Sequence, residues 1–149
     1  MAELLYANLG RRPYGPVLEL QRRLVERALA EPRWQPRLLL VEHDPPAITL
    51  GRGAKAEHVL ASAEELAAAG VEVHHVRRGG DVTVHGPGQL VGYPILRLDA
   101  DGAGVRGYLR DLEEALIRLL GRFGVAGERA PGLTGVWVAR EKVAAIGVA

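Results

Sequence analysis

The sequence predicts an α+β domain in which helices flank a mixed or antiparallel sheet. Its 149 residues have the length of one domain, and 48% hydrophobic with 25% charged residues is the composition of a folded globular protein. Segments with helical and strand spacing follow one another irregularly, whereas a parallel sheet needs regular strand-helix-strand units. Short turns rich in glycine and proline between neighbouring strand segments favour hairpin-like pairing.

Charge and composition exclude several classes of function. Nineteen Lys and Arg residues balance eighteen Asp and Glu, which gives a net charge of +1 and no basic field for a nucleic acid. No segment is apolar over the length that a membrane span needs. The chain contains no cysteine, so it has neither disulfides nor thiolate metal ligands, and it fits a reducing compartment. We therefore expect a cytoplasmic protein that binds neither nucleic acid nor membrane.

The first elements are a helix and two apolar segments. Apolar residues recur at helical spacing over 15–30, and Pro16 suits the first turn of this helix. A buried apolar run follows over 37–43, and a Pro-Pro break at 45–46 separates it from a short β-like segment over 48–50.

Two further helices have recognisable ends. Ser62 and Glu65 stand at capping-box spacing, and Gly70 is placed as a C-terminal stop, which predicts a short helix between them. The longest helix should cover about 105–123, because its leucines and Phe123 form one stripe, and Gly124 ends it.

Strand-like segments surround a glycine-rich block and close the chain. Segment 71–76 leads into the block and segment 89–96 leads out of it, while 135–139 and 142–148 form a final pair. The chain stops at Ala149 inside an apolar run, where natural domains seldom end. We therefore expect that a C-terminal part of the domain is missing.

The block RRGGDVTVHGPGQL, residues 77–90, contains more chemistry than a turn requires. If its centre is extended, Val82 and Val84 share one face, and the other face carries Asp81, Thr83 and His85. The arrangement suits either a ligand pocket or a hairpin that holds His85 in the core. His43 has the better fit to a structural role. His74 and His75 are adjacent and point to opposite faces, so we assign no metal site.

Four blocks, EHDPPAITLGR, RRGGDVTVHGPGQLVGYPIL, PGLTGVWV and EKVAAIGV, together resemble the lipoyl(octanoyl) transferase family. The resemblance covers the chain from Leu4 onward and the N-terminal larger part of the family's domain. It implies the α+β fold shared with biotin and lipoate ligases. It also implies a single acyltransferase catalytic domain over 1–149 that moves an octanoyl group from octanoyl-acyl carrier protein to lipoyl domains. These are the lipoyl domains of 2-oxoacid dehydrogenases and of the glycine cleavage system, and no cofactor is implied.

The resemblance also assigns residues, all of them by match to the family's motifs. The family's catalytic lysine is matched by Lys142. Its acyl-pocket block is matched by Arg78, Gly79, Gly80, Asp81, Val82, Thr83, Val84 and His85, and its second pocket segment is matched by Ala145, Ile146 and Gly147. The family's nucleophile is a cysteine in a later segment that this chain lacks, so the thiol is expected outside the chain.

The chemistry of an acyl-enzyme explains these residue types. Lys142 would favour a thiolate and accept the proton of the incoming amine. The glycines Gly79 and Gly80 would keep an acyl tunnel open beside the valines. Two alternatives remain: an ATP-using lipoate or biotin ligase, which needs no cysteine, and a non-catalytic acyl-binding module. Gly86 and Gln89 depart from the acidic residue and asparagine of the ligases, which favours the transferase.

Overall fold

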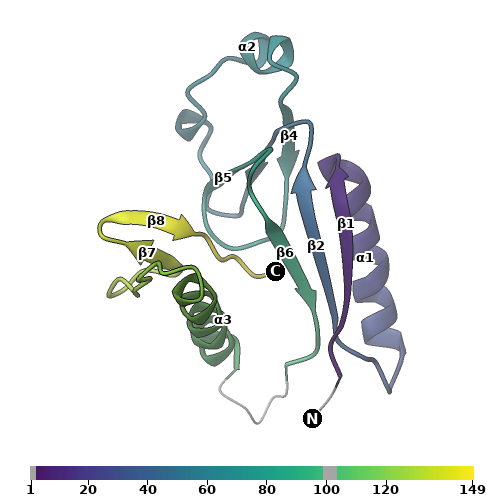
Figure 1. Cartoon of the computed structure of the whole chain (residues 1–149). Helices are drawn as coiled ribbons and strands as arrows, with labels where there is room; N and C mark the ends of the chain where they lie inside the picture. Colours follow the sequence, from purple (N-terminus) through teal and green to yellow (C-terminus); the bar gives the residue numbers. More distant parts are fainter. Residues whose placement is uncertain (1–2, 99–103) are drawn as a thin grey trace. The chain divides into compact units, whose positions relative to one another are not determined.

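The computed structural model describes residues 3–98 and 104–149. These residues form two compact units, one built from the residues up to Arg97 together with Ala149 and the other from Leu98–Val148. Each unit combines a long helix with β-strands (Figure 1). The predicted α+β class with mixed sheets is confirmed.

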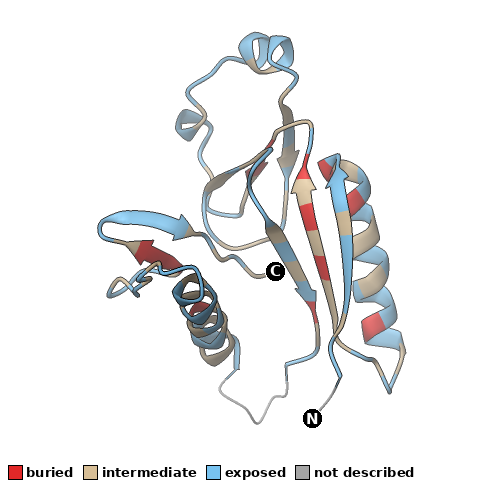
Figure 2. Cartoon of the chain, viewed as in Figure 1, coloured by how far each residue is buried: buried red, intermediate tan, exposed pale blue. Residues whose placement is uncertain are grey.

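The first unit contains a mixed sheet that one helix covers. Its strand order is β1-β2-β6, in which β1 (Leu5–Arg12) runs parallel to β2 (Arg37–His43), and β6 (Val91–Ile95) runs antiparallel to β2. Helix α1 (Tyr14–Ala30) lies along this sheet (Figure 1). Leu20, Leu24 and Ala28 on its apolar stripe belong to the core that the helix forms with the sheet. Buried residues gather on β2 and on one stripe of α1 (Figure 2), around a core of Ala28, Leu39 and Ile95.

A second mixed sheet of the same unit carries the glycine-rich block. Its central strand β3 (Ala47–Leu50) runs parallel to β4 (Glu72–His75) and antiparallel to β5 (Val82–His85). The connection from β3 to β4 contains a short 3-10 helix, η1 (Ala56–His58), and the helix α2 (Ala63–Ala68).

Helix α2 has the ends that the sequence predicts. The backbone N–H of Glu65 donates to Ser62 Oγ at 3.2 Å, and the backbone N–H of Ser62 donates to Glu65 Oε2 at 2.7 Å. Both halves of the capping box are therefore formed. Gly70, two residues past the helix, has a φ of +67°, which a side chain would oppose.

The second unit consists of one helix and one hairpin. Helix α3 (Gly104–Gly121) is followed by β7 (Val136–Val138) and β8 (Glu141–Ala144), which pair antiparallel. Val136 is fully buried, and Trp137 beside it is nearly so. In the described parts of the chain, neither α1 nor α3 combines the length and the apolar composition that crossing a membrane requires.

The structure adds one strand to the predicted elements and corrects two expectations. Strand β1 was not predicted from the sequence. The last strand, β8, ends at Ala144 rather than continuing to 148. Helix α3 ends at Gly121 rather than at 123, and the end of its predicted apolar stripe is open, because Phe123 is 77% exposed and Leu119 is 47% exposed.

Candidate functional site

The residues assigned from the sequence are divided between the two units. The block from Arg78 to His85 belongs to the first unit, while Lys142 and Ala145–Gly147 belong to the second. The chemistry of each group follows from its own surroundings.

Arg78 ties the glycine loop to β3. Its Nη2 donates to the Thr49 carbonyl at 2.9 Å and to Thr49 Oγ1 at 2.7 Å, and its Nη1 donates to the Gly79 carbonyl at 3.0 Å. Thr49 is fully buried, so the anchor is rigid. The guanidinium therefore holds the loop's shape, and its predicted contact with an acyl group stays a prediction.

The turn after β3 and the glycine loop approach each other closely. Their backbones are joined by hydrogen bonds from Gly51 N–H to the Asp81 carbonyl at 2.9 Å, from Arg52 N–H to the Arg78 carbonyl at 3.0 Å and from Gly53 N–H to the Gly80 carbonyl at 3.0 Å. A Cβ at Gly51 would lie 2.5 Å from the Gly80 oxygen. Gly80 itself has a φ of +87°. Gly51 therefore has to be a glycine because there is no room for a Cβ, whereas Gly80 has to be one because of its backbone conformation.

The two faces of β5 alternate as predicted, and the polar face is the inward one, with Thr83 and His85 half-buried. Paired residues on adjacent strands share a face. Thr83 is paired with the fully buried Thr49, and Val84 is paired with Ile48 on the opposite side, where Val84 is 58% exposed. On this inward face, His85 and its neighbour His74 from β4 pack against the ring of Tyr14 from α1. The apolar face is left more open.

His85 belongs to this inward face and has a defined tautomer. Gln89 Nε2 donates to the Val84 carbonyl at 3.2 Å, which leaves Gln89 Oε1 to accept from His85 Nδ1–H at 2.7 Å. The imidazole stacks on Tyr14 with ring centroids 5.9 Å apart and planes 14° apart. Burial lowers the pKa of His85, so the ring is neutral at pH 7 and its Nε2 is an acceptor.

His43 completes a cluster that the sequence does not reveal. Its Nδ1–H donates to the Arg12 carbonyl at 3.1 Å, and its Nε2 accepts from the Tyr93 hydroxyl at 2.8 Å. The residue is fully buried, and burial lowers the pKa of His43. Tyr14 contacts the rings of both His43 and His74, at centroid distances of 4.9 and 4.7 Å. His43 is thus structural, as expected.

The tyrosines Tyr14 and Tyr93 were missed by the sequence reasoning. Neither stands in a motif, and only tertiary packing, with β6 paired to β2 and α1 against the sheet, brings them to His43. Burial raises the pKa of both hydroxyls, so Tyr93 stays a neutral donor to His43.

Asp81 precedes β5 and faces a different partner. His58 Nδ1 lies 2.5 Å from Asp81 Oδ2, and this hydrogen bond lowers the pKa of Asp81. His58 comes from η1, which the sequence does not predict. Asp81 thus stabilises the connection between β3 and β4 at the glycine loop.

Lys142 lies on β8, directly opposite Trp137 of β7. Its Nζ is 4.7 Å from the centroid of the indole ring, a distance at which the cation and the ring attract. The lysine is exposed, and Ala145, Ile146 and Gly147 follow beyond the end of the strand. Within residues 3–98 and 104–149, no three acidic or histidine side chains come together as a metal site would require.

Comparison of the sequence with known proteins identifies the family of this chain. Residues 13–149 match the family model of the lipoyl protein ligase A/B catalytic domain. An octanoyltransferase of Acidobacterium capsulatum is 54% identical over 95% of this chain, and one of Chloroflexus aggregans is 49% identical over 99% of it. The chain spans 62% and 67% of the lengths of these two relatives. The resemblance drawn from the four sequence blocks is confirmed.

A solved structure supports the fold. The bi-partite lipoate protein ligase of Thermoplasma acidophilum superposes with a TM-score of 0.72 at 18% identity, over 94% of this chain and 52% of that one. Fold, motif order and sequence identity thus agree, and the chain belongs to the lipoyl protein ligase A/B catalytic domain family.

Proposed function

We propose that this protein transfers an octanoyl group from octanoyl-acyl carrier protein to a lysine of a lipoyl domain, a step of lipoate biosynthesis. The observation that carries the proposal is 49–54% identity with octanoyltransferases over 95–99% of the chain. Lipoyl domains of 2-oxoacid dehydrogenases and of the glycine cleavage system are the acceptors in this proposal. In this proposal the reaction needs no cofactor, and we place it in the cytoplasm.

The open apolar face of the second sheet supports binding of an acyl chain. Ile48, Val73 and Val84 share this face, because β3 pairs in register with β4 and β5. Val73 on β4 is 44% exposed and Val84 on β5 is 58% exposed, while Ile48 between them is only 8% exposed, so the apolar surface that a ligand could cover lies over the two outer strands. Each methylene that is buried contributes roughly 0.8 kcal/mol.

The reaction itself proceeds in two displacements. A cysteine thiolate attacks the thioester carbonyl of octanoyl-acyl carrier protein, a new carbon-sulfur bond forms, and the carrier's thiolate leaves. The amine of the lipoyl-domain lysine then attacks this acyl-enzyme, loses a proton and displaces the cysteine thiolate. The 149 residues contain no cysteine, so the proposal assigns the thiol to a segment outside them.

Residues of this chain supply binding and proton transfer. We assign proton acceptance from the incoming amine to Lys142 in its neutral form, and stabilisation of the thiolate to its charged form. His85, with Nδ1–H engaged by Gln89, presents a neutral Nε2 that accepts a hydrogen bond. The remaining pocket residues of the proposal are Arg78, Gly79, Gly80, Asp81, Val82, Thr83, Val84, Ala145, Ile146 and Gly147.

An ATP-free transfer assay tests the proposal. The whole protein is incubated with octanoyl-acyl carrier protein and a lipoyl domain, and mass spectrometry should show the lipoyl domain gaining one octanoyl group. Lys142→Ala should abolish the transfer, whereas Lys55→Ala, at the other lysine of the chain, should not. Transfer that depends on ATP and free octanoate would identify a ligase. Binding of the octanoyl donor without turnover would identify an acyl-binding module.

A further inference from the structure

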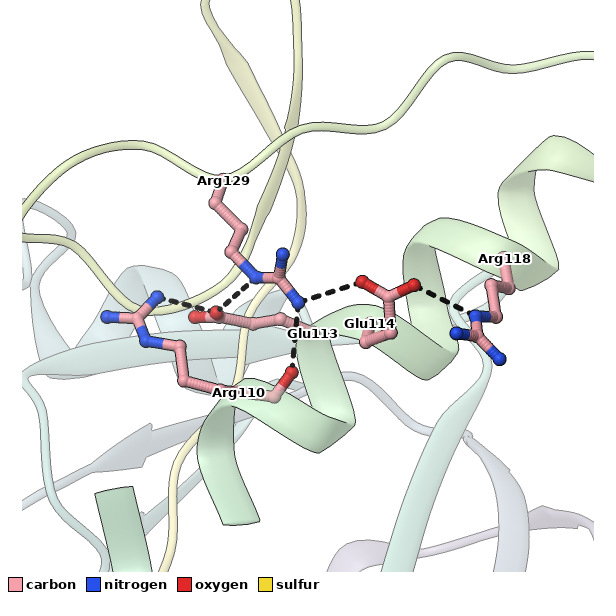
Figure 3. A network of polar contacts seen from close by, with 5 residues as sticks. All are labelled: Arg110, Glu113, Glu114, Arg118 and Arg129. Carbon is pink, nitrogen blue, oxygen red and sulfur yellow. Dashed lines mark hydrogen bonds and ion pairs between the residues drawn. The ribbon is translucent and has the colours of Figure 1, made fainter. Parts of the chain in front are cut away.

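The second unit holds a buried carboxylate to which the proposed reaction gives no role. Glu113 of α3 is fully buried, and three donors surround it: Arg110 Nη1 at 2.6 Å, Arg129 Nε at 3.2 Å and the backbone N–H of Gly135 at 3.0 Å. Figure 3 shows both arginines converging on it. Burial alone would raise the pKa of Glu113, but the hydrogen bonds from Gly135 and Arg110 outweigh it and lower the pKa. The group is therefore an anion at pH 7.

The hydrogen bond between Glu113 and the Gly135 N–H connects the carboxylate to β7, the strand that pairs with the strand of Lys142. Gly135 immediately precedes β7 and has a φ of +129°, which side chains rarely adopt. A Cβ at this residue would lie 2.5 Å from the Ala144 oxygen and 3.5 Å from Lys142 Cε. The carbonyl and the lysine stem thus lie against the bare Cα of the residue that Glu113 holds.

Trp137 holds the other end of the same side chain. It lies opposite Lys142 in the hairpin, and the Lys142 Nζ is 4.7 Å from the indole centroid. An exposed lysine otherwise samples many rotamers. Here its stem lies beside Gly135 and its ammonium lies over Trp137.

We propose that Glu113 is a positioning residue for Lys142, which it serves by fixing Gly135 through the hydrogen bond from its N–H. The proposal rests on the proposed function, in which Lys142 transfers protons. The carboxylate contacts no reacting atom. It sets the position of β7, and through β7 the position of the Lys142 stem and of the ring under its ammonium.

The adjacent residue, Glu114, is a matched control. It has the same chemistry and also binds two arginines, Arg118 Nε at 2.8 Å and Arg129 Nη2 at 2.9 Å (Figure 3). It shares Arg129 with Glu113, but its own side chain is 40% exposed, and both of its partners are arginines outside the hairpin, whereas Glu113 also binds Gly135. Glu114→Gln should therefore leave the position of the Lys142 side chain unchanged. In Glu113→Gln, the amide nitrogen must face either the arginines or the Gly135 N–H, and all of these groups are hydrogen-bond donors, so one hydrogen bond is lost.

Lysine NMR measures the position of Lys142 directly. Protein labelled with ¹³C-lysine gives a Cε–Hε signal for each lysine, and the Lys55→Ala and Lys142→Ala variants identify the signals of the two lysines of this chain. The indole ring should shift the Lys142 signal away from that of the exposed Lys55. In Glu113→Gln this separation should fall by more than half, and in Glu114→Gln it should not change.

Kinetics of octanoyl transfer give the second reading. Glu113→Gln should lower kcat at least tenfold and change KM for octanoyl-acyl carrier protein less than threefold, because binding of the donor does not involve the hairpin's lysine. A merely structural Glu113 would lower the melting temperature but leave the Lys142 signal and the kcat of the folded protein unchanged, and this result would overturn the proposal. If the whole wild-type protein does not transfer the octanoyl group at all, the proposed function fails, while the NMR measurement still decides whether Glu113 positions Lys142.

A measurement on the wild type covers the case in which Glu113→Gln does not fold. The Gly135 amide should exchange with deuterium much more slowly than the amide of the exposed Gly132. Rapid exchange at Gly135, or coincident Lys55 and Lys142 signals, would contradict the proposed chain of contacts.

Discussion

Replacing Gly51 by alanine tests the close approach on which the glycine loop depends. The added Cβ would lie 2.5 Å from the Gly80 oxygen, 2.7 Å from Arg78 Nη1 and 3.1 Å from the Asp81 oxygen. All three distances are shorter than the 3.4 Å at which ordinary van der Waals contact begins. Two of the three neighbours are backbone atoms in the hydrogen-bonded pairing of the two segments, so neither can rotate away.

The expected loss of stability follows from these contacts. Overpacking of this kind costs about 1–3 kcal/mol. Displacing the Gly80 carbonyl also weakens the hydrogen bond that it accepts from Gly53 N–H, which is worth about 0.5–1.5 kcal/mol. The smaller entropy of the unfolded alanine chain offsets about 0.4–1 kcal/mol. Gly51→Ala should therefore lower the free energy of unfolding by about 1–3 kcal/mol.

Urea denaturation followed by circular dichroism measures this change. Gly15→Ala is the matched control, because its Cβ would meet only the His74 ring at 3.8 Å, an ordinary contact, inside helix α1. That variant should be at least as stable as the wild type, since alanine favours helices. A Gly51→Ala protein as stable as Gly15→Ala would refute the reasoning and would mean that the loop yields easily.

Two further outcomes are expected in the same unit. Gly80→Ala and Gly80→Val should both lower the melting temperature, valine more than alanine, because both must adopt a φ of +87° that a β-branched side chain opposes most. A defect in octanoyl binding confined to valine, with short acyl groups bound normally, would point to obstruction of an acyl tunnel instead. Burial lowers the pKa values of His43 and His85 below 6.5, so the unfolded chain binds more protons just below that pH and stability should fall as pH drops through 6.5. His43→Gln should flatten this dependence in melting curves, and an unchanged slope would argue against it.

Local signals in the sequence were sufficient for several elements. The capping box of α2 involves residues three apart, and both of its hydrogen bonds are formed. The helix over 15–30 is α1, because its apolar spacing reflects one continuous buried stripe. Strand β1 carries no such signal. Its residues are mostly exposed, and a register shift between Asn8 and Arg11 breaks the alternation by which a strand is recognised.

The surroundings of His85 could not be predicted, because they come from distant parts of the chain. Tyr14, His43 and His74 belong to α1, β2 and β4, and their rings meet through tertiary pairing. Alternation correctly separated the valines from Thr83 and His85, but it does not say which face is inward. Here burial of the polar face depends on the aromatic ring that covers it, and the usual preference for apolar burial is reversed.

At the glycines, the role that the sequence motif assigns differs from the physical reason that the structure gives. A motif groups Gly79 and Gly80 with a ligand pocket, and the structure gives Gly80 a conformational reason that no ligand is needed to explain. Gly51 and Gly135 stand outside the assigned pocket residues, yet each is required by a backbone oxygen 2.5 Å from where a Cβ would be. In both cases the oxygen belongs to a segment with assigned residues, the Gly80 loop in one unit and the Lys142 strand in the other. Glycines beside the recognised motifs therefore hold those motifs in place, and substitutions at Gly51 and Gly135 should perturb them as strongly as substitutions within them.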